Sequence, residues 1–282
     1  MNDWLPLIQK MAVFVFLVSS MMATGLSLAP AEIMGPLRDL RCVLLSLVLN
    51  FVFAPAFAWL LTVVIPLESG HAAGLLLLSG AAGAPFLPKL VDTARGDPAL
   101  AAGLMVLLTA ATILFLPFAV PLMVPGLPAD PWSIARPLVL LIVVPLAAGM
   151  LVKSRLAGFA WRAAPVLARI GNASLLLLFV LLITVNIRSL LGVLGSGAIA
   201  AAAIYVFGLF ATGWLLGGSE PRKRGVLGLA TAARNFGAAL VPAASSQDSH
   251  VTIMLIVCAI VCLVICFLAA GWLRRMMISA PR

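Results

Sequence analysis

The sequence predicts an all-α integral membrane protein with about nine transmembrane helices. Hydrophobic residues make up 63% of its 282 residues, charged residues make up only 10%, and the mean hydropathy is +1.20. Soluble domains are about half apolar and one quarter charged, so this chain has too few charges to cover a water-facing surface of its size. A helix needs about 20 apolar residues to cross a bilayer, and about nine such runs fit the length of the chain.

The apolar runs are bounded by charges and by helix-breaking residues. The first run is too long for the apolar core of a signal peptide, and Arg38 and Arg41 follow it closely. The third run is rich in glycine, alanine and proline, and it ends at a polar loop, while most later runs start or stop at proline, glycine or a basic residue. We predict one transmembrane domain over residues 1–282, with spans at 8–28, 41–65, 72–92, 98–125, 137–152, 170–187, 192–216, 225–244 and 251–273.

The distribution of basic residues predicts the orientation in the membrane. If the N-terminus lies outside, the outer loops carry only Arg136 and Arg188. Cytoplasmic loops attract lysine and arginine, so we expect an inner (cytoplasmic) membrane protein with its N-terminus outside and its C-terminus in the cytoplasm. No basic stripe is interleaved with aromatic residues, which argues against nucleic-acid binding despite the net charge of +9. The basic residues then assigned to the cytoplasm are Arg38, Arg41, Arg95, Lys153, Arg155, Arg162, Arg169, Arg222, Lys223, Arg224, Arg274, Arg275 and Arg282.

Two spans, 72–92 and 225–244, are predicted to be broken. Proline removes an amide donor from a helix and clashes with the preceding turn, and a broken membrane helix needs compensation from protein or from a cavity. The two stretches occupy comparable positions in the two halves of the chain, which is typical of an inverted-repeat transporter with its site at the midplane. Close packing with a simple kink is the alternative. The residues on which the breaks depend are Gly83, Pro85, Pro88 and Gly237.

Polar residues in and near these breaks are the candidate substrate-binding residues. Arginine inside a membrane segment is costly, and its guanidinium suits a carboxylate or a similar anion. We therefore predict a site formed by Arg234, Asn235, Asn50 and Thr231. In the alternative interpretation, Arg234 reaches an interface or pairs with Asp92 or with a backbone carbonyl, and Asn50 bonds across helices.

Other polar residues allow weaker predictions. Lys89 and Asp92 lie one turn apart, which fits an ion pair at the cytoplasmic edge or a coupling or gating role. His71 and His250 are expected at the outer surface. The remaining reactive side chains, Cys258, Cys262 and Cys266, share one helix face without a nearby histidine or carboxylate, so packing is favoured over a metal site and no metal is predicted.

Several stretches resemble the bile acid:sodium symporter superfamily, which also includes arsenite and other organic-anion carriers. They are MMATGLSLAPAEIMGPLRDLRCVLLSLVLNFVFAP, GAAGAPFLPKLVDTARGDPALAAGLMVLL and GLATAARNFGAALVPAA. The resemblance implies a panel domain, a core domain and two broken helices that cross at the site. Some members have ten spans, and on this resemblance we expect the first of them to be missing here, which leaves nine.

The sodium sites implied by the resemblance are not preserved. Ser and Asn of the usual motif in the first broken helix fall on Leu87 and Pro88, and the hydroxyl ligands of the next helix fall on Ala101 and Met105. The glutamate and glutamine of the second broken helix fall on Ala230 and Arg234, and only Asn50 keeps an amide. Sodium needs several oxygen ligands, like other hard cations.

The sequence therefore predicts a secondary active transporter that moves a small organic anion by alternating access and that differs from sodium-coupled members at the ion site. A sodium-coupled symporter of bile-acid type is the main alternative. An enzyme would need a catalytic constellation, and a channel would need a polar stripe along several spans; neither pattern is present. No cofactor is predicted, the coupling ion is left open between sodium and proton, and the expected partners are the anionic solute and the lipid bilayer. The oligomeric state and the direction of transport are not assigned.

Overall fold

The computed structural model describes residues 4–28, 38–124 and 130–279, and every regular element in them is a helix. The predicted all-α class is therefore confirmed. The elements are α1 (Trp4–Ser27), α3 (Leu40–Val48), the π-helical segment η2 (Leu49–Phe53), α4 (Ala54–Val64), α5 (Ser69–Ser79), α6 (Leu87–Thr93), α7 (Pro98–Met123), α8 (Pro131–Leu138), the π-helical segment η3 (Val139–Val143), α9 (Val144–Arg155), α10 (Ala157–Val185), α11 (Ile187–Gly192), α12 (Ala198–Leu216), α13 (Pro221–Ala232), α14 (Phe236–Ala243) and α15 (Ser249–Ser279).

Eight helical stretches in the described part of the chain are long and apolar enough to cross a membrane. The remaining predicted span, 72–92, is not one of these eight, because it is divided into the short helices α5 and α6, with residues 80–86 between them. The helix α13 likewise ends at Ala232, and α14 begins at Phe236. Both predicted breaks are therefore present.

Two helices begin earlier than the hydropathy pattern indicates. The helix α8 begins at Pro131 rather than near residue 137, and α10 begins at Ala157 rather than near residue 170. Arg162 and Arg169, expected in a loop, consequently lie inside α10. A long arginine side chain can carry its charge to the membrane surface while its stem lies along the helix, so basic residues do not have to end a span.

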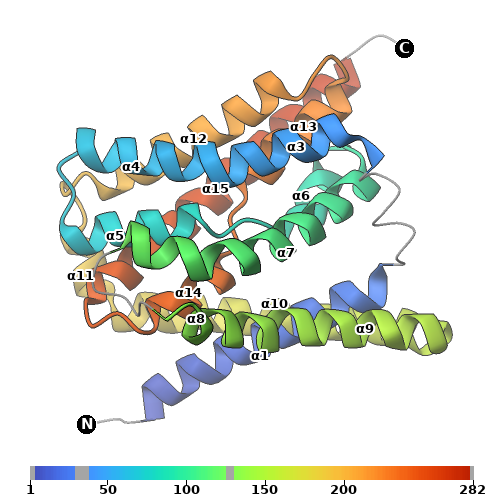
Figure 1. Ribbon diagram of the computed structural model, residues 1–282, viewed down its shortest axis with the longest axis horizontal. Coiled ribbons are helices and arrows are strands. Elements are labelled where there is room, and N and C mark those ends of the chain that lie inside the picture. The colour runs from blue at the N-terminus through green and yellow to red at the C-terminus, as the bar shows by residue number, and fades with distance from the viewer. Residues whose placement is uncertain (1–3, 29–37, 125–129, 280–282) are drawn as a thin grey trace.

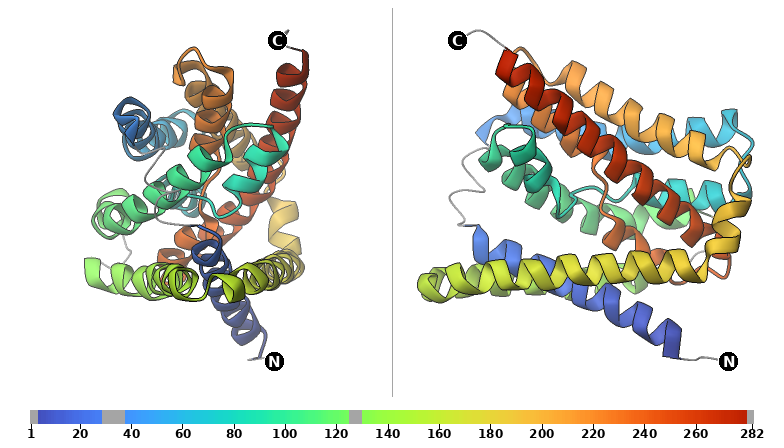
Figure 2. Two further views of the ribbon diagram at one scale, coloured as in Figure 1. Left: turned by 90° about the vertical axis from the view of Figure 1, so that its right-hand side faces the viewer. Right: turned by 180° about the vertical axis from the view of Figure 1, so that it is seen from behind.

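The helices form two layers (Figures 1 and 2). One layer contains α1, α9 and α10, which pack on one another, and the other contains α3–α4, α5–α7, α12, α13 and α15. These layers correspond to the predicted panel and core. Glycines bring α1 and α9 close together, because a Cβ atom on Gly25 would overlap Leu146 O and one on Gly149 would overlap Met22 O.

The core contains the same order of elements twice. A long helix, α3–α4, is followed by the broken pair α5/α6 and the long helix α7; later, α12 is followed by the broken pair α13/α14 and α15. The helix α5 contacts α14, and α6 contacts α13. The two broken helices therefore cross where each is interrupted, as an inverted-repeat transporter requires.

A π-helical segment places one polar residue at this crossing. The segment η2 precedes Pro55, which has no amide hydrogen to continue the α-helical bonding, and the wider turn accommodates that loss. Asn50 lies in η2, is fully buried, and donates from Nδ2 to Ser46 O at 2.9 Å. Its side-chain oxygen, Oδ1, is left to accept a hydrogen bond from another helix of the core.

Candidate functional site

Asn235 joins the two breaks. Its backbone N–H donates to Ala81 O at 2.9 Å, and its Nδ2 donates to Gly83 O at 3.2 Å. Its Oδ1 accepts from Ala238 N at 3.0 Å, which caps the start of α14. A single buried side chain thus holds the first break, the second break and a helix end together.

Two threonines of α7 support the first break from the other side. Thr112 Oγ1 accepts from Ala82 N at 2.9 Å and lies 3.1 Å from Ala82 O, to which it donates. Thr109 Oγ1 lies 2.9 Å from Gly83 O. Gly83 has φ +79°, and a Cβ atom there would overlap the backbone of Thr109, so only glycine fits this position. Sequence analysis missed both threonines, although hydroxyls three residues apart in an apolar span share one helix face.

Arg234 is fully buried at the crossing, and its guanidinium binds oxygens of the protein itself. It donates to Asn50 Oδ1 at 2.7 Å, to Leu78 O and Thr231 O at 3.3 Å each, and to Ser79 O. These contacts use most of the five N–H donors of a guanidinium. Within the described residues Arg234 has no carboxylate partner, so its charge is balanced by neutral oxygens.

The oxygens around Arg234 form a cradle that suits a cation. Leu78 and Ser79 end α5, and the last carbonyls of a helix lack partners within it and carry a partial negative charge. Asn50 adds an amide oxygen from a different helix. We call Asn50 Oδ1, Leu78 O and Ser79 O the oxygen cradle.

The structure brings together only part of the predicted site. Asn50, Arg234 and Asn235 lie at the crossing, but the Thr231 hydroxyl donates to Leu227 O at 2.8 Å within its own helix, and only its backbone carbonyl meets Arg234. Gly237 allows α14 to approach Leu17 of α1. Whether any of these residues binds a substrate stays a prediction.

A cavity of about 410 Å³ lies between the panel and the core, on the Lys89 side of the first break. Pro85, Pro88 and Lys89 line it, whereas Arg234 and Asn235 do not. Lys89 and Asp92 form no ion pair in the described part of the chain. The panel also contributes polar side chains to the cavity, namely Ser20, Thr24, Ser27 and Asn172. Sequence analysis missed them, because a single hydroxyl or amide within an apolar span gives no distinctive pattern.

Comparison with known proteins identifies the family. A search for relatives among curated proteins gives no significant match. The chain matches the sodium bile acid symporter family over residues 14–193, well over half of its length. This range contains α5, α6, α9, α10 and most of α1, and it ends before α12, so Arg234 lies beyond the matched residues. The broken crossing helices, the apolar spans and this match together show that the chain belongs to the sodium bile acid symporter family and is a membrane transporter.

Proposed function

We propose that the protein is a secondary active transporter of a small organic anion that operates without sodium, with its substrate bound in the cavity between panel and core. The observation that carries this proposal is the position of the Arg234 guanidinium in the oxygen cradle. The panel and core layers around a cavity support alternating access, because one layer can move against the other around a fixed site.

Arg234 takes the role of a coupling cation in this proposal. The cradle offers helix-end carbonyls and an amide oxygen, which are ligands suited to a hard cation. A sodium ion about 4 Å from the guanidinium would meet a repulsion of about 4 kcal/mol at an effective dielectric constant of 20. The tethered charge therefore both replaces the ion and excludes it.

The other positions aligned with sodium ligands support the same conclusion. Leu87, Met105 and Ala230 are buried, and their side chains offer no oxygen, as is also true of Pro88 and Ala101. A sodium-coupled symporter remains the competing proposal, and membership of the family favours it.

The cavity between panel and core suits a small anion better than the crossing of the broken helices, because the cavity has open space and an accessible cation. Because Arg234 is enclosed, we assign the contact with the anion to Lys89, whose side chain is exposed to the cavity, with Asn172 as a second donor from the panel. An ammonium group next to Pro85 and Phe86 would attract a carboxylate while the apolar wall accepts the rest of the solute.

Uptake of small carboxylates into proteoliposomes tests the proposal. We expect saturable uptake at the same rate in sodium and in potassium buffers. Lys89→Gln should raise KM about 10- to 150-fold, since a hydrogen bond to a charged group contributes about 1.5–3 kcal/mol. Lys10→Gln, an exposed lysine that does not line the cavity, is the matched control. Uptake that stops without sodium would overturn the sodium-independent cycle, and an unchanged KM in Lys89→Gln would overturn the assignment of the cavity.

A further inference from the structure

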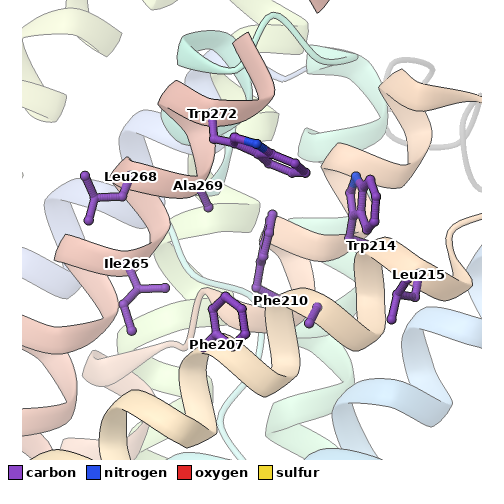
Figure 3. A pocket seen from close by; sticks show the side chains of 9 residues that line it. Phe207, Phe210, Trp214, Leu215, Ile265, Leu268, Ala269 and Trp272 are labelled. Atoms are coloured by element: carbon purple, nitrogen blue, oxygen red, sulfur yellow. The ribbon is translucent and has the colours of Figure 1, made fainter. Parts of the chain in front are cut away.

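A second cavity, of about 580 Å³, lies between α12 and α15, and it is lined only by apolar and aromatic side chains. Figure 3 shows Phe207 and Ile265 toward one end of this groove, and Trp214 and Trp272 toward the other. The residues Phe207, Leu215 and Leu268 are more than 60% exposed, so the groove opens on the surface that faces the hydrocarbon of the membrane. We call it the aromatic groove.

At the tryptophan end of the groove the aromatic rings pack on one another. The rings of Trp214 and Trp272 lie 5.4 Å apart at an interplanar angle of 65°, and Trp272 also meets Phe210 edge-on at 6.3 Å. Tryptophan side chains are enriched at the level of the lipid headgroups, where one side of the ring is apolar and the other is wet. This end of the groove is therefore the expected boundary between acyl chains and headgroups.

Arginine residues adjoin the tryptophan end. Arg224 lies over the Trp214 ring, 3.9 Å from its centroid, and its Nε donates to Trp214 O at 3.0 Å, which leaves the terminal nitrogens for another partner. Arg275 follows Trp272 by three residues and therefore continues the groove face of α15. Neither arginine has a carboxylate partner among the residues that the structure describes.

From this combination we infer that the aromatic groove binds one acyl chain of an anionic phospholipid, whose phosphate is held by Arg224 and Arg275. The apolar groove accepts the chain, the two tryptophans mark the headgroup level, and the guanidinium groups, which have no carboxylate partner among the described residues, supply donors for a phosphate. Basic pockets between membrane helices at the cytoplasmic side suit anionic headgroups, and the predicted orientation places this end there. A second copy of the chain is the competing occupant, but two arginines next to the groove favour a negatively charged partner.

The site also has a structural consequence that is separate from transport. Trp214 lies in the last turn of α12, Arg224 is in the first part of α13, and Trp272 and Arg275 are in α15. A lipid held by all three would bind α12 and α15 to α13, which is the first half of the second broken helix.

Quenching of tryptophan fluorescence by brominated lipid tests this inference without a transport assay. A variant that keeps only Trp214 and Trp272 is needed, with Trp4, Trp59, Trp132 and Trp161 replaced by phenylalanine; these four side chains are all more than half exposed, so the change is mild. The protein is placed in vesicles of dibrominated phosphatidylcholine, and unbrominated phosphatidylglycerol or phosphatidylcholine is added. Recovery of fluorescence reports replacement of the quencher in the groove.

We expect phosphatidylglycerol to restore fluorescence at a mole fraction several-fold lower than phosphatidylcholine. Arg275→Gln and Arg224→Gln should each reduce this preference about fivefold, as about 1 kcal/mol per basic residue near an anionic surface implies. Arg274→Gln is the matched control, because Arg274 has the same charge at the same depth but lies two residues from Trp272, on another face of α15. Equal recovery with both lipids would show ordinary lipid contact and overturn the inference. Weak quenching by the brominated phosphatidylcholine before any lipid is added, together with cross-linking of two copies through the groove, would overturn it in favour of a dimer.

Discussion

At the scale of single residues, Arg234 is the side chain that the sequence singles out and the structure explains. An arginine within an apolar stretch predicts a special environment, but its partners could not be predicted, because Leu78 and Ser79 lie 156 and 155 residues away in the chain. Of the alternatives open at the sequence level, contact with backbone carbonyls is the one that the structure contains. Asn50 was predicted as a polar residue of the same site, and its carbonyl oxygen does meet the guanidinium.

Replacement of Arg234 by alanine tests whether the oxygen cradle needs a cation. We expect Arg234→Ala to lower the melting temperature of the purified protein, because Asn50 Oδ1 and two helix-end carbonyls lose their donor, and each such bond to a charged group contributes about 1.5–3 kcal/mol. Guanidinium ions at millimolar concentration should restore part of the loss in the variant and have no effect on the wild type.

Arg188→Ala is the control for this experiment, since Arg188 is exposed in the short helix α11. If both variants melted at the same temperature, the cradle would not depend on the cation.

At the scale of the elements, the sequence predicts the helix breaks, but it does not predict the side chains from other helices that hydrogen-bond to them. Glycine and proline in two matched stretches predict interruptions through local backbone chemistry alone. The side chains that hydrogen-bond to a break depend on which helix packs beside it, and this is decided by tertiary structure. Thr109 and Thr112 therefore could not be distinguished in the sequence from other residues of an apolar span. The cysteines of α15 show the same limit, because the Cys262 thiol faces Ala232 O, 3.6 Å away at the end of α13.

The starts of α5 and α15 lie side by side and share a polar cluster. Glu68 Oε2 lies 3.7 Å from His71 Nδ1 and 3.4 Å from His250 Nε2, and Asp248 Oδ1 lies 2.9 Å from His250 Nδ1. His250 is partly exposed, but His71 is only 2% exposed, so the expectation that both histidines lie at the outer surface is wrong for His71. The protein packs His250 edge-on over the His71 ring, with centroids 5.1 Å apart, and so covers it.

Asp248 should make the start of α15 sensitive to acid. The backbone N–H of His250 donates to the Asp248 carboxylate and lowers its pKa from the ordinary 3.8, and the ring of His250 adds to this effect. A carboxyl group with a lowered pKa stabilises the folded protein above its unfolded pKa, and the contribution is lost as the pH falls through the folded value.

We expect Asp248→Asn to melt at a lower temperature than the wild type at pH 7, and the difference should disappear as the pH falls below about 3.8. Asp130→Asn is the comparison, since Asp130 also caps the start of a helix, α8, but has no histidine nearby. It separates the effect of losing a helix cap from the effect of losing the contact with His250. A difference for Asp248→Asn that stayed constant down to the lowest pH would contradict this account.

At the scale of the whole molecule, hydropathy predicts the spans, and family resemblance predicts how they are grouped. Apolar composition determines that helices cross the membrane, but it does not determine which helices pack together, because lipid and neighbouring helices are equally apolar. Panel and core could therefore be expected only from the resemblance, and the polar lining of the cavity from α1 and α10 could not be recognised at all.

Cross-linking across the cavity tests whether panel and core move relative to each other. A cysteine pair at Thr24 in the panel and Phe86 in the core, joined by a bifunctional thiol reagent, should stop uptake into proteoliposomes, and cleavage of the linker should restore it. A pair at Met22 in α1 and Ala163 in α10, which pack on the same cluster within the panel and do not line the cavity, should be cross-linked with little effect on uptake. Continued transport by the first cross-linked pair would contradict alternating access between the two layers.

The tethered guanidinium has an electrical consequence. Because Arg234 cannot dissociate, it brings no net charge across the membrane in a complete cycle, unlike a bound ion that is released. In the proposed cycle a monovalent anion then crosses as a net negative charge, and a membrane potential of 100 mV, negative inside, changes its transfer free energy by about 2.3 kcal/mol. That difference corresponds to a concentration ratio of roughly fifty in favour of the outside. Without an accompanying proton, the membrane voltage would drive this carrier toward efflux.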